Sequence, residues 1–316
     1  MVATTARRAT VSPGLLRAAL PVASLALILA AIFYLQPRAM SYFGLNLLLN
    51  LAVPIALATI AQMFVLCVND LDLSIGAFVG FCACVTATFL NDTPLLGILV
   101  LGLAIAAYGA LGALIEWQRL PSIVVTLGMS FVWTGLAILV LPTPGGSAPG
   151  WLRALMTWQP PLVPLPIILS LLIGVAVWLG LNRSATGAVL RGAGGNPRSV
   201  ALAGWSMVRI RATMFALAGL FGVLSGMLLV GLTTSADANI ALRYTLLSIA
   251  GAILGGCEFT GGRVSPVGAV IGALTLTLAA SFLSFLRLSP DWQIGAQGGI
   301  LIVVLALRVL VSRREA

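Results

Sequence analysis

The sequence predicts an all-α fold, a polytopic integral membrane helix bundle of about ten spans with both termini in the cytosol. Of its 316 residues, 60% are hydrophobic and only 8% are charged, and the mean hydropathy is +1.12. A soluble domain carries roughly a quarter charged residues, so this chain lacks the polar surface to cover a water-facing globule. Its apolar runs are ~20 residues long and do not alternate with polar residues, which favours helices over a β-barrel.

Ten apolar runs, separated by polar and Pro/Gly-rich breaks, give the expected helices in order. They cover residues 15–35, 45–67, 73–90, 95–117, 121–141, 164–181, 211–233, 244–260, 265–286 and 293–311. Because 73–90 and 244–260 are short, eight spans with two re-entrant pieces fit nearly as well. We expect residues 1–316 to form one transmembrane domain with a cytosolic tail at 1–14, its first run kept as a helix and not cleaved as a signal.

The basic residues set the expected orientation. All 17 are Arg, and the chain contains no His. With the N-terminus in the cytosol, the inside segments hold all of them except Arg38, Arg153, Arg243 and Arg287, as the positive-inside rule requires. The net charge of +9 therefore reflects membrane orientation, and we expect a lipid bilayer and no nucleic acid as a partner.

Composition also argues against several kinds of site. Residues 142–163 and 182–210, the longest less apolar intervals, are too short for a nucleotide-binding domain, and a phosphate loop needs a Lys that the chain lacks. The four Cys, at 67, 82, 84 and 257, lie in or beside apolar runs. We expect reduced structural thiols, with no disulfide framework, metal or cofactor.

The most informative motif is the polar stretch 68–76, which interrupts a long apolar region. Two of the eight acidic residues lie here, and a carboxylate at the bilayer centre costs about 2.5–3.5 kcal/mol. One interpretation is a helix start at the membrane interface, with Asn69 as N-cap and Asp72 completing a capping box. The others are a broken helix on a polar pathway and a proton- or cation-coupling site. The candidate pathway or gate residues are Asn69, Asp70, Asp72 and Ser74.

Three further segments carry predictions. In 182–211, a turn ends in Asn196 and Pro197, which suit the N-cap and first turn of a short helix over 198–203; the segment is either a docking site for a cytosolic partner or an ordinary basic loop. In 254–263, Glu258 and Arg263 are placed to neutralise each other. The outward loop 142–163 carries two Trp that are interfacial anchors or part of a docking surface.

Glycines spaced four apart predict close helix packing at 76/80, 222/226, 251/255 and 268/272.

Four motifs in register carry a family resemblance. Residues 70–76 resemble Gly-Gly-Ile-Asp-Leu-Ser-Val-Gly, and 121–129 are similar to Pro-Phe-Ile-(Val/Ala)-Thr-Leu-Gly. Residues 192–204 resemble Ala-Ile-Gly-Gly-Asn-Pro…Ala-x-x-Ser-Gly, and 254–263 are similar to Leu-Gly-Gly-x-x-x-x-Gly-Gly-(Arg/x). Together they resemble the monosaccharide permeases of ribose/xylose/arabinose-type ABC importers, within the branched-chain amino acid/sugar permease superfamily. The chain departs from that pattern at Asn69-Asp70, at Ala203, and at Thr245 and Leu247, where the family has an acidic pair.

The resemblance implies a permease subunit that is not itself an enzyme, in the bacterial cytoplasmic (inner) membrane. Its expected partners are a second permease subunit, identical or different, cytosolic ABC ATPase subunits that hydrolyse ATP, and a periplasmic substrate-binding protein. Segment 182–211 would then be the ATPase-coupling element, through Arg191, Gly194, Gly195, Asn196, Pro197 and Arg198. The alternatives are a permease for branched-chain amino acids or nucleosides and, in another class, an ion- or proton-coupled secondary transporter that uses Asp70 and Asp72.

Overall fold

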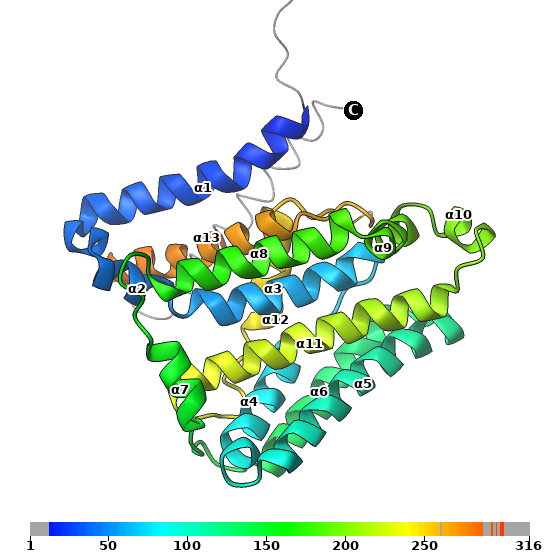
Figure 1. Ribbon diagram of the computed structural model, residues 1–316, viewed down its shortest axis with the longest axis horizontal. Helices are drawn as coiled ribbons and strands as arrows, with labels where there is room; N and C mark the ends of the chain where they lie inside the picture. Colours follow the sequence, from blue (N-terminus) through cyan, green and yellow to red (C-terminus); the bar gives the residue numbers. More distant parts are fainter. Residues whose placement is uncertain (1–12, 260, 287–291, 293–294, 296–297, 300–316) are drawn as a thin grey trace, which may run out of the picture.

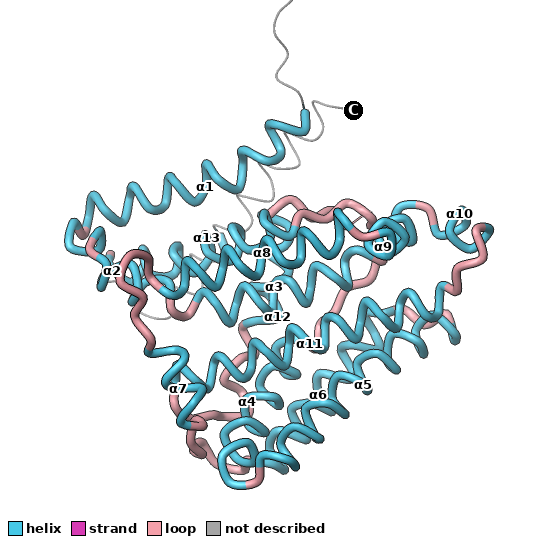
Figure 2. The backbone as a smooth tube through the Cα atoms, in the orientation of Figure 1, coloured by secondary structure: helices cyan, strands magenta, loops and turns pink. Residues whose placement is uncertain are grey.

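The computed structural model describes residues 13–259, 261–286, 292, 295, 298 and 299. Over these residues the chain forms thirteen α-helices and one 3-10 helix, and its only β-type pairing is an isolated bridge between Gly145 and Ala236. Figures 1 and 2 show most of the long helices stacked side by side with their axes in similar directions. The all-α expectation is therefore confirmed for the part of the chain that the structure describes.

Each predicted run up to residue 286 contains a helix, and the tenth run, 293–311, falls almost wholly outside the described residues. Six described helices are long and apolar enough to span a membrane, or seven if α2 and α3, bent by 42°, form one span. The helices are α1 (Pro13–Leu35), α2 (Tyr42–Leu49), α3 (Ala52–Cys67), α4 (Ile75–Asp92), α5 (Pro94–Gln118), α6 (Ser122–Val140), α7 (Gly150–Thr157), α8 (Leu165–Arg183), α9 (Ala185–Gly195), α10 (Pro197–Leu202), α11 (Met207–Thr233), α12 (Tyr244–Leu254) and α13 (Pro266–Phe285), with the 3-10 helix at Pro37–Met40.

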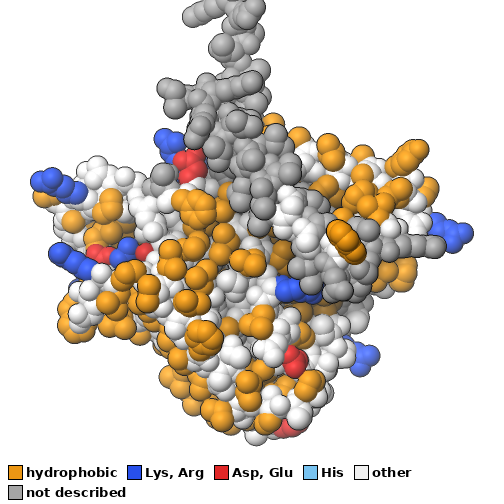
Figure 3. Space-filling model, turned by 180° about the vertical axis from the view of Figure 1, so that it is seen from behind, with side chains coloured by type: hydrophobic (Ala, Val, Ile, Leu, Met, Phe, Trp, Pro, Cys, Tyr) orange, Lys and Arg blue, Asp and Glu red, His pale blue; other side chains and the backbone are white. Residues whose placement is uncertain are grey.

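Helix α3 forms the centre of the bundle, because all of its residues are buried. On one side it packs against α12 and α13, and α13 in turn contacts α1 and α8. On the other side it packs against α11, which also contacts α4 and α5, while α6 covers α4. The outer helices α5, α6 and α8 expose large apolar side chains, and Figure 3 shows hydrophobic side chains over much of one face. This surface suits lipid tails or a second membrane protein.

Two glycine pairs bring α12 and α13 into backbone contact. A Cβ atom at Gly255 would collide with the backbone of Gly268, and one at Gly272 would collide with the backbone of Gly251. The pairs 251/255 and 268/272 therefore face each other. The prediction of close packing from this spacing is confirmed at these positions.

Two spans are interrupted, and both interruptions correct the sequence-based boundaries. After α3 ends, residues 68–74 turn back along it, so that the backbone of Asp72 pairs with the side-chain amide of Gln62 at 3.0 and 3.1 Å. Residues 234–243 separate two predicted runs and were placed outside together with Arg243, but they run along α4, where Gly80 faces Ala238. The helix expected over 244–260 ends at Leu254. Sequence analysis also missed α7 and α9, which lie in segments interpreted as loops.

Candidate functional site

Loop 68–74 is fixed at one end of the bundle by a group of three charged side chains. Asp70 is 7% exposed, and its Oδ2 lies 2.7 Å from Nε of Arg211, close enough for a strong charge interaction although the two atoms are not aligned as a linear hydrogen bond. Arg211 also pairs with Glu116 at the end of α5. The Asp70–Arg211–Glu116 triad thus links the loop to α5 and α11 and compensates a buried carboxylate.

Asp72 lies deeper and is held by neutral groups. It is fully buried, and its Oδ1 accepts hydrogen bonds from the backbone N–H and the hydroxyl of Ser74, both at 2.7 Å. Its Oδ2 accepts a hydrogen bond from the Tyr108 hydroxyl. The ring of Tyr108 packs against Phe78, with centroids 4.3 Å apart, and against Trp133. Hydrogen bonding of this kind is what makes a buried carboxylate tolerable without a cationic partner.

The predicted capping box at Asn69 is wrong. Asn69 has a φ of 64°, in the left-handed region that Asn tolerates, and its Nδ2 donates to the carbonyl of Gly194 at 2.8 Å. The chain then continues without helix, and the hydroxyls of Ser122 and Thr126 on α6 accept hydrogen bonds from the backbone N–H groups of residues 71 and 73. The helix starts only at Ile75. Asn69 therefore joins loop 68–74 to α9.

The short helix predicted in the 182–211 segment is confirmed as α10. The Asn196 side chain accepts a hydrogen bond from the N–H of Ser199 at 3.1 Å, and Pro197 occupies the first turn. No residue of α10 is buried, and Figure 1 shows it standing away from the bundle. Leu202 is 81% exposed and Trp205 is 48% exposed. This end of the molecule presents an exposed basic and apolar surface.

The coupling candidates divide into two groups. Gly195, Asn196, Pro197 and Arg198 are exposed and lie at the start of α10 or just before it. Arg191 instead donates to the side chain of Asn182 at 2.5 Å, and Gly194 is buried against the carbonyl of Cys67, with no room for a Cβ atom. These two residues hold α9 to the membrane helices.

The other residues singled out in the sequence lie nearby or at the surface. Cys67 also accepts a backbone hydrogen bond from Gly262 at 2.9 Å, which ties the end of α3 to loop 255–265. In that loop Glu258 and Arg263 lie 3.6 Å apart, as predicted, in a solvent-exposed pair of small energetic weight. All four Cys are buried free thiols. Trp151 and Trp158 are each 57% exposed.

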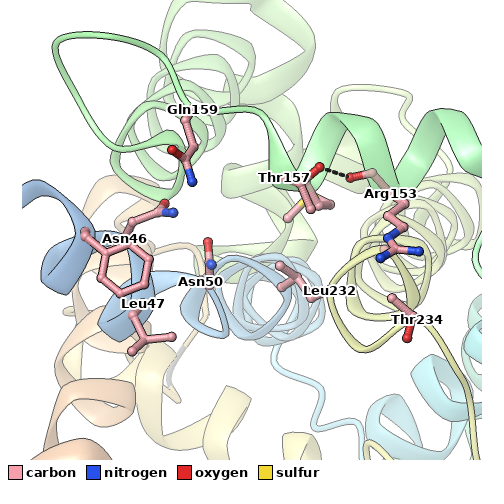
Figure 4. Close-up of a pocket in the computed structure, with 11 residues that line it drawn as sticks. Asn46, Leu47, Asn50, Arg153, Thr157, Gln159, Leu232 and Thr234 are labelled. Atoms are coloured by element: carbon pink, nitrogen blue, oxygen red, sulfur yellow. Dashed lines mark hydrogen bonds between the residues drawn. The ribbon is translucent and has the colours of Figure 1, made fainter.

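A polar cavity at the opposite end of the bundle was missed by sequence analysis. It has a volume of about 330 Å³ and lies between α2, α7 and the end of α11. Figure 4 shows the side chains of Asn46, Asn50 and Gln159 around it, with Arg153 and Thr157 on its other side. The sequence signal was the spacing of two Asn four apart in an apolar run, which places both on one helix face.

Residues 44–305 match the family model described as the permease component of the branched-chain amino acid transport system. The chain belongs to this family. The matched part of this permease contains loop 68–74, segment 182–211 and loop 255–265.

Relatives of this permease align over most of its length. It is 29% identical over 316 residues to the galactose/methyl galactoside import permease protein of Escherichia coli K12, covering 92% of this chain and 94% of the relative. It is 26% identical over 259 residues to the D-allose transport system permease protein of the same organism, covering 80% and 79%. It is 27% identical over 279 residues to the ribose import permease protein of Bacillus subtilis, covering 86% and 85%. No solved structure matches it.

Proposed function

We propose that this chain is the membrane-spanning permease subunit of an ABC importer for a monosaccharide, in the bacterial inner membrane. The observation that carries the proposal is the alignment over most of the chain with three permeases named for galactose, allose and ribose. Its partners are a second permease subunit, two cytosolic ATPase subunits and a periplasmic sugar-binding protein. The ATP hydrolysis takes place in the ATPase subunits.

In this proposal the chain spans the membrane about ten times, and the α9/α10 end faces the cytosol. The distribution of arginines in the described residues supports that orientation. The end that carries loop 68–74 and α10 has Arg119, Arg183, Arg191, Arg198, Arg209, Arg211 and Arg263, whereas the end that carries α2 and α7 has Arg38 and Arg153. The polar cavity in Figure 4 then opens on the side where the binding protein delivers solute.

The exposed residues of α10 bind the ATPase in this proposal. Closure of the ATPase dimer moves α10 as a rigid body together with the helices joined to it. Two connections carry the movement inward: the Asn69–Gly194 hydrogen bond reaches loop 68–74, and the first turns of α11 reach Asp70 through Arg211. Asn69, Asp70, Asp72 and Ser74 thus act as positioning residues of a gate and not as solute ligands.

A secondary transporter driven by Asp70 and Asp72 has less support. A coupling carboxylate must exchange its proton or ion with water, but Asp70 is paired with Arg211 and Asp72 is saturated by hydrogen bonds. Branched-chain amino acids and nucleosides remain the alternative cargoes. The names of the relatives favour a sugar.

Uptake in cells tests the proposal. The chain is expressed with the ATPase and binding protein encoded beside its gene, in a strain lacking its own uptake of D-ribose, D-galactose and D-allose. We expect ATP-dependent uptake of at least one labelled sugar, abolished when either partner is omitted. Uptake by the chain alone in vesicles, driven by an ion or proton gradient, would overturn the proposal in favour of a secondary transporter. Uptake of leucine or adenosine in place of all three sugars would overturn the cargo.

A further inference from the structure

Segment 234–243 enters the bundle as non-helical chain and reaches its interior. It starts at the end that carries α7, where Ala236 pairs with Gly145 and the following Gly146 contacts Ala87 on α4. It then passes Gly80, which faces the carbonyl of residue 238. It ends where the N–H of Gly76 donates to the hydroxyl of Thr245 at 3.0 Å, at the start of α12.

The lengths of the helices beside this segment indicate its depth in the membrane. From Gly76 to Asp92, the other end of α4, sixteen residues rise about 24 Å at 1.5 Å per residue. In the opposite direction, Tyr108 touches Ser74 and lies eight residues, or about 12 Å, from Glu116 of the charged triad. Since the hydrocarbon core of a bilayer is about 30 Å thick, the chain around residues 242–245 lies inside the core, about 6 Å from its middle on the side of the triad.

Arg243 lies at this depth with its side chain exposed. Its guanidinium makes no hydrogen bond or ion pair with any residue that the structure describes, and its neighbours Leu242 and Leu246 are 46% and 68% exposed. An arginine facing lipid at the bilayer centre costs about 2.5–3.5 kcal/mol even on the most lenient scale. Arginines at such depth face water-filled cavities or partners.

We propose that Arg243 lines the water-filled translocation pathway at mid-membrane and donates hydrogen bonds to oxygen atoms of the passing solute. The inference rests on the proposed importer function. A guanidinium carries five N–H donors and no acceptor, so it suits the adjacent hydroxyls of a sugar. Because the side chain is open to water, these bonds exchange readily with solvent. Such a contact fits a solute in transit, not one tightly bound.

Thiol labelling tests where Arg243 lies. The four native Cys are buried, so a membrane-impermeant methanethiosulfonate has little background. In the assembled importer in membranes we expect Arg243→Cys to be labelled in at least one nucleotide state and to be protected by the transported sugar. The matched control is Leu103→Cys on α5, 61% exposed at comparable depth on an apolar face, which we expect to stay unlabelled. Arg153→Cys at the surface is the positive control.

If Arg243→Cys is labelled in none of the nucleotide states while Arg153→Cys is labelled, the inference is overturned. Equal labelling of Arg243→Cys and Leu103→Cys would overturn it as well. Transport gives a second readout: Arg243→Gln should lower sugar uptake about 10-fold, the loss of a hydrogen bond to a charged group, with a smaller loss in Arg243→Lys. Wild-type uptake by Arg243→Gln would also refute it. If instead the wild-type importer takes up none of the probe sugars, the proposed function has failed and not this inference.

Discussion

The charged triad makes a quantitative prediction about loop 68–74. Changing Asp70 to Asn removes one of two acidic partners from Arg211, which is 19% exposed in its side chain and keeps Glu116. Complete loss of a partner from a buried pair costs about 3–5 kcal/mol, but the retained Glu116 reduces this, so we expect the free energy of unfolding to fall by about 1–3 kcal/mol.

Arg211→Met should lower the free energy of unfolding by more, about 3–5 kcal/mol, because it leaves the buried Asp70 carboxylate with no cationic partner. Glu116→Gln should cost only about 0.5–1 kcal/mol, since Glu116 is 26% exposed and water replaces its partner. The assay is reversible unfolding of the purified permease in mixed micelles, followed by circular dichroism. Equal losses from Asp70→Asn and Glu116→Gln, or a larger loss from Glu116→Gln, would refute the assignment of Asp70 as the buried member.

Three further predictions follow. Gly255→Ala should lower the free energy of unfolding by about 1–3 kcal/mol, because its Cβ would meet the backbone of α13. Gly102→Ala, which faces open space, should change it by less than about 0.5 kcal/mol. Equal effects of the two changes in the same unfolding assay would contradict the close packing. Tyr108→Phe should lower the free energy of unfolding by about 1.5–3 kcal/mol, since it removes one hydrogen bond to the Asp72 carboxylate. If the variant unfolds as the wild-type protein does, this bond contributes nothing to stability. Arg198→Glu should abolish sugar-stimulated ATPase activity of the assembled importer without changing unfolding, and intact stimulation would remove Arg198 from the ATPase contact.

The regular parts of the fold were predictable because hydropathy and turn residues report them directly. The apolar runs up to residue 286 gave each long helix within a few residues, and Asn196 with Pro197 gave the start of α10. The glycine spacing in α12 and α13 gave their close contact, since small residues four apart form one flat stripe on a helix.

Interrupted spans were among the alternatives that the sequence left open, but their conformation was not predictable, because it is set by partners distant in sequence. Nothing near Asn69 signals that its side chain bonds Gly194 rather than the next helix, and local capping preference pointed the wrong way. The non-helical course of the loop depends on hydroxyls of α6, some 50 residues further along the chain. Segment 234–243 was expected outside because it lies between two predicted helices in an alternating topology. Its inward course depends on Gly76 and Gly80, which leave room for its backbone against α4.

The two interrupted spans connect the coupling end of the molecule to mid-membrane. Gly194 of the coupling segment bonds Asn69; loop 68–74 leads from there to the start of α4; and the N–H of Gly76 bonds Thr245, two residues beyond Arg243. Each step is a short hydrogen bond or a stretch of fixed backbone, so displacement of α9 reaches the residues around Arg243 without passing through the soft apolar packing of the outer helices. A route of this kind becomes a mechanism only when its ends are shown to be coupled. A double-mutant cycle supplies that test: Asn69→Ala and Thr245→Val should each uncouple ATPase activity from uptake, and the double variant should be no worse than the more damaging single change. Additive losses would mean that the two bonds act separately and that the movement reaches the pathway through α11 instead.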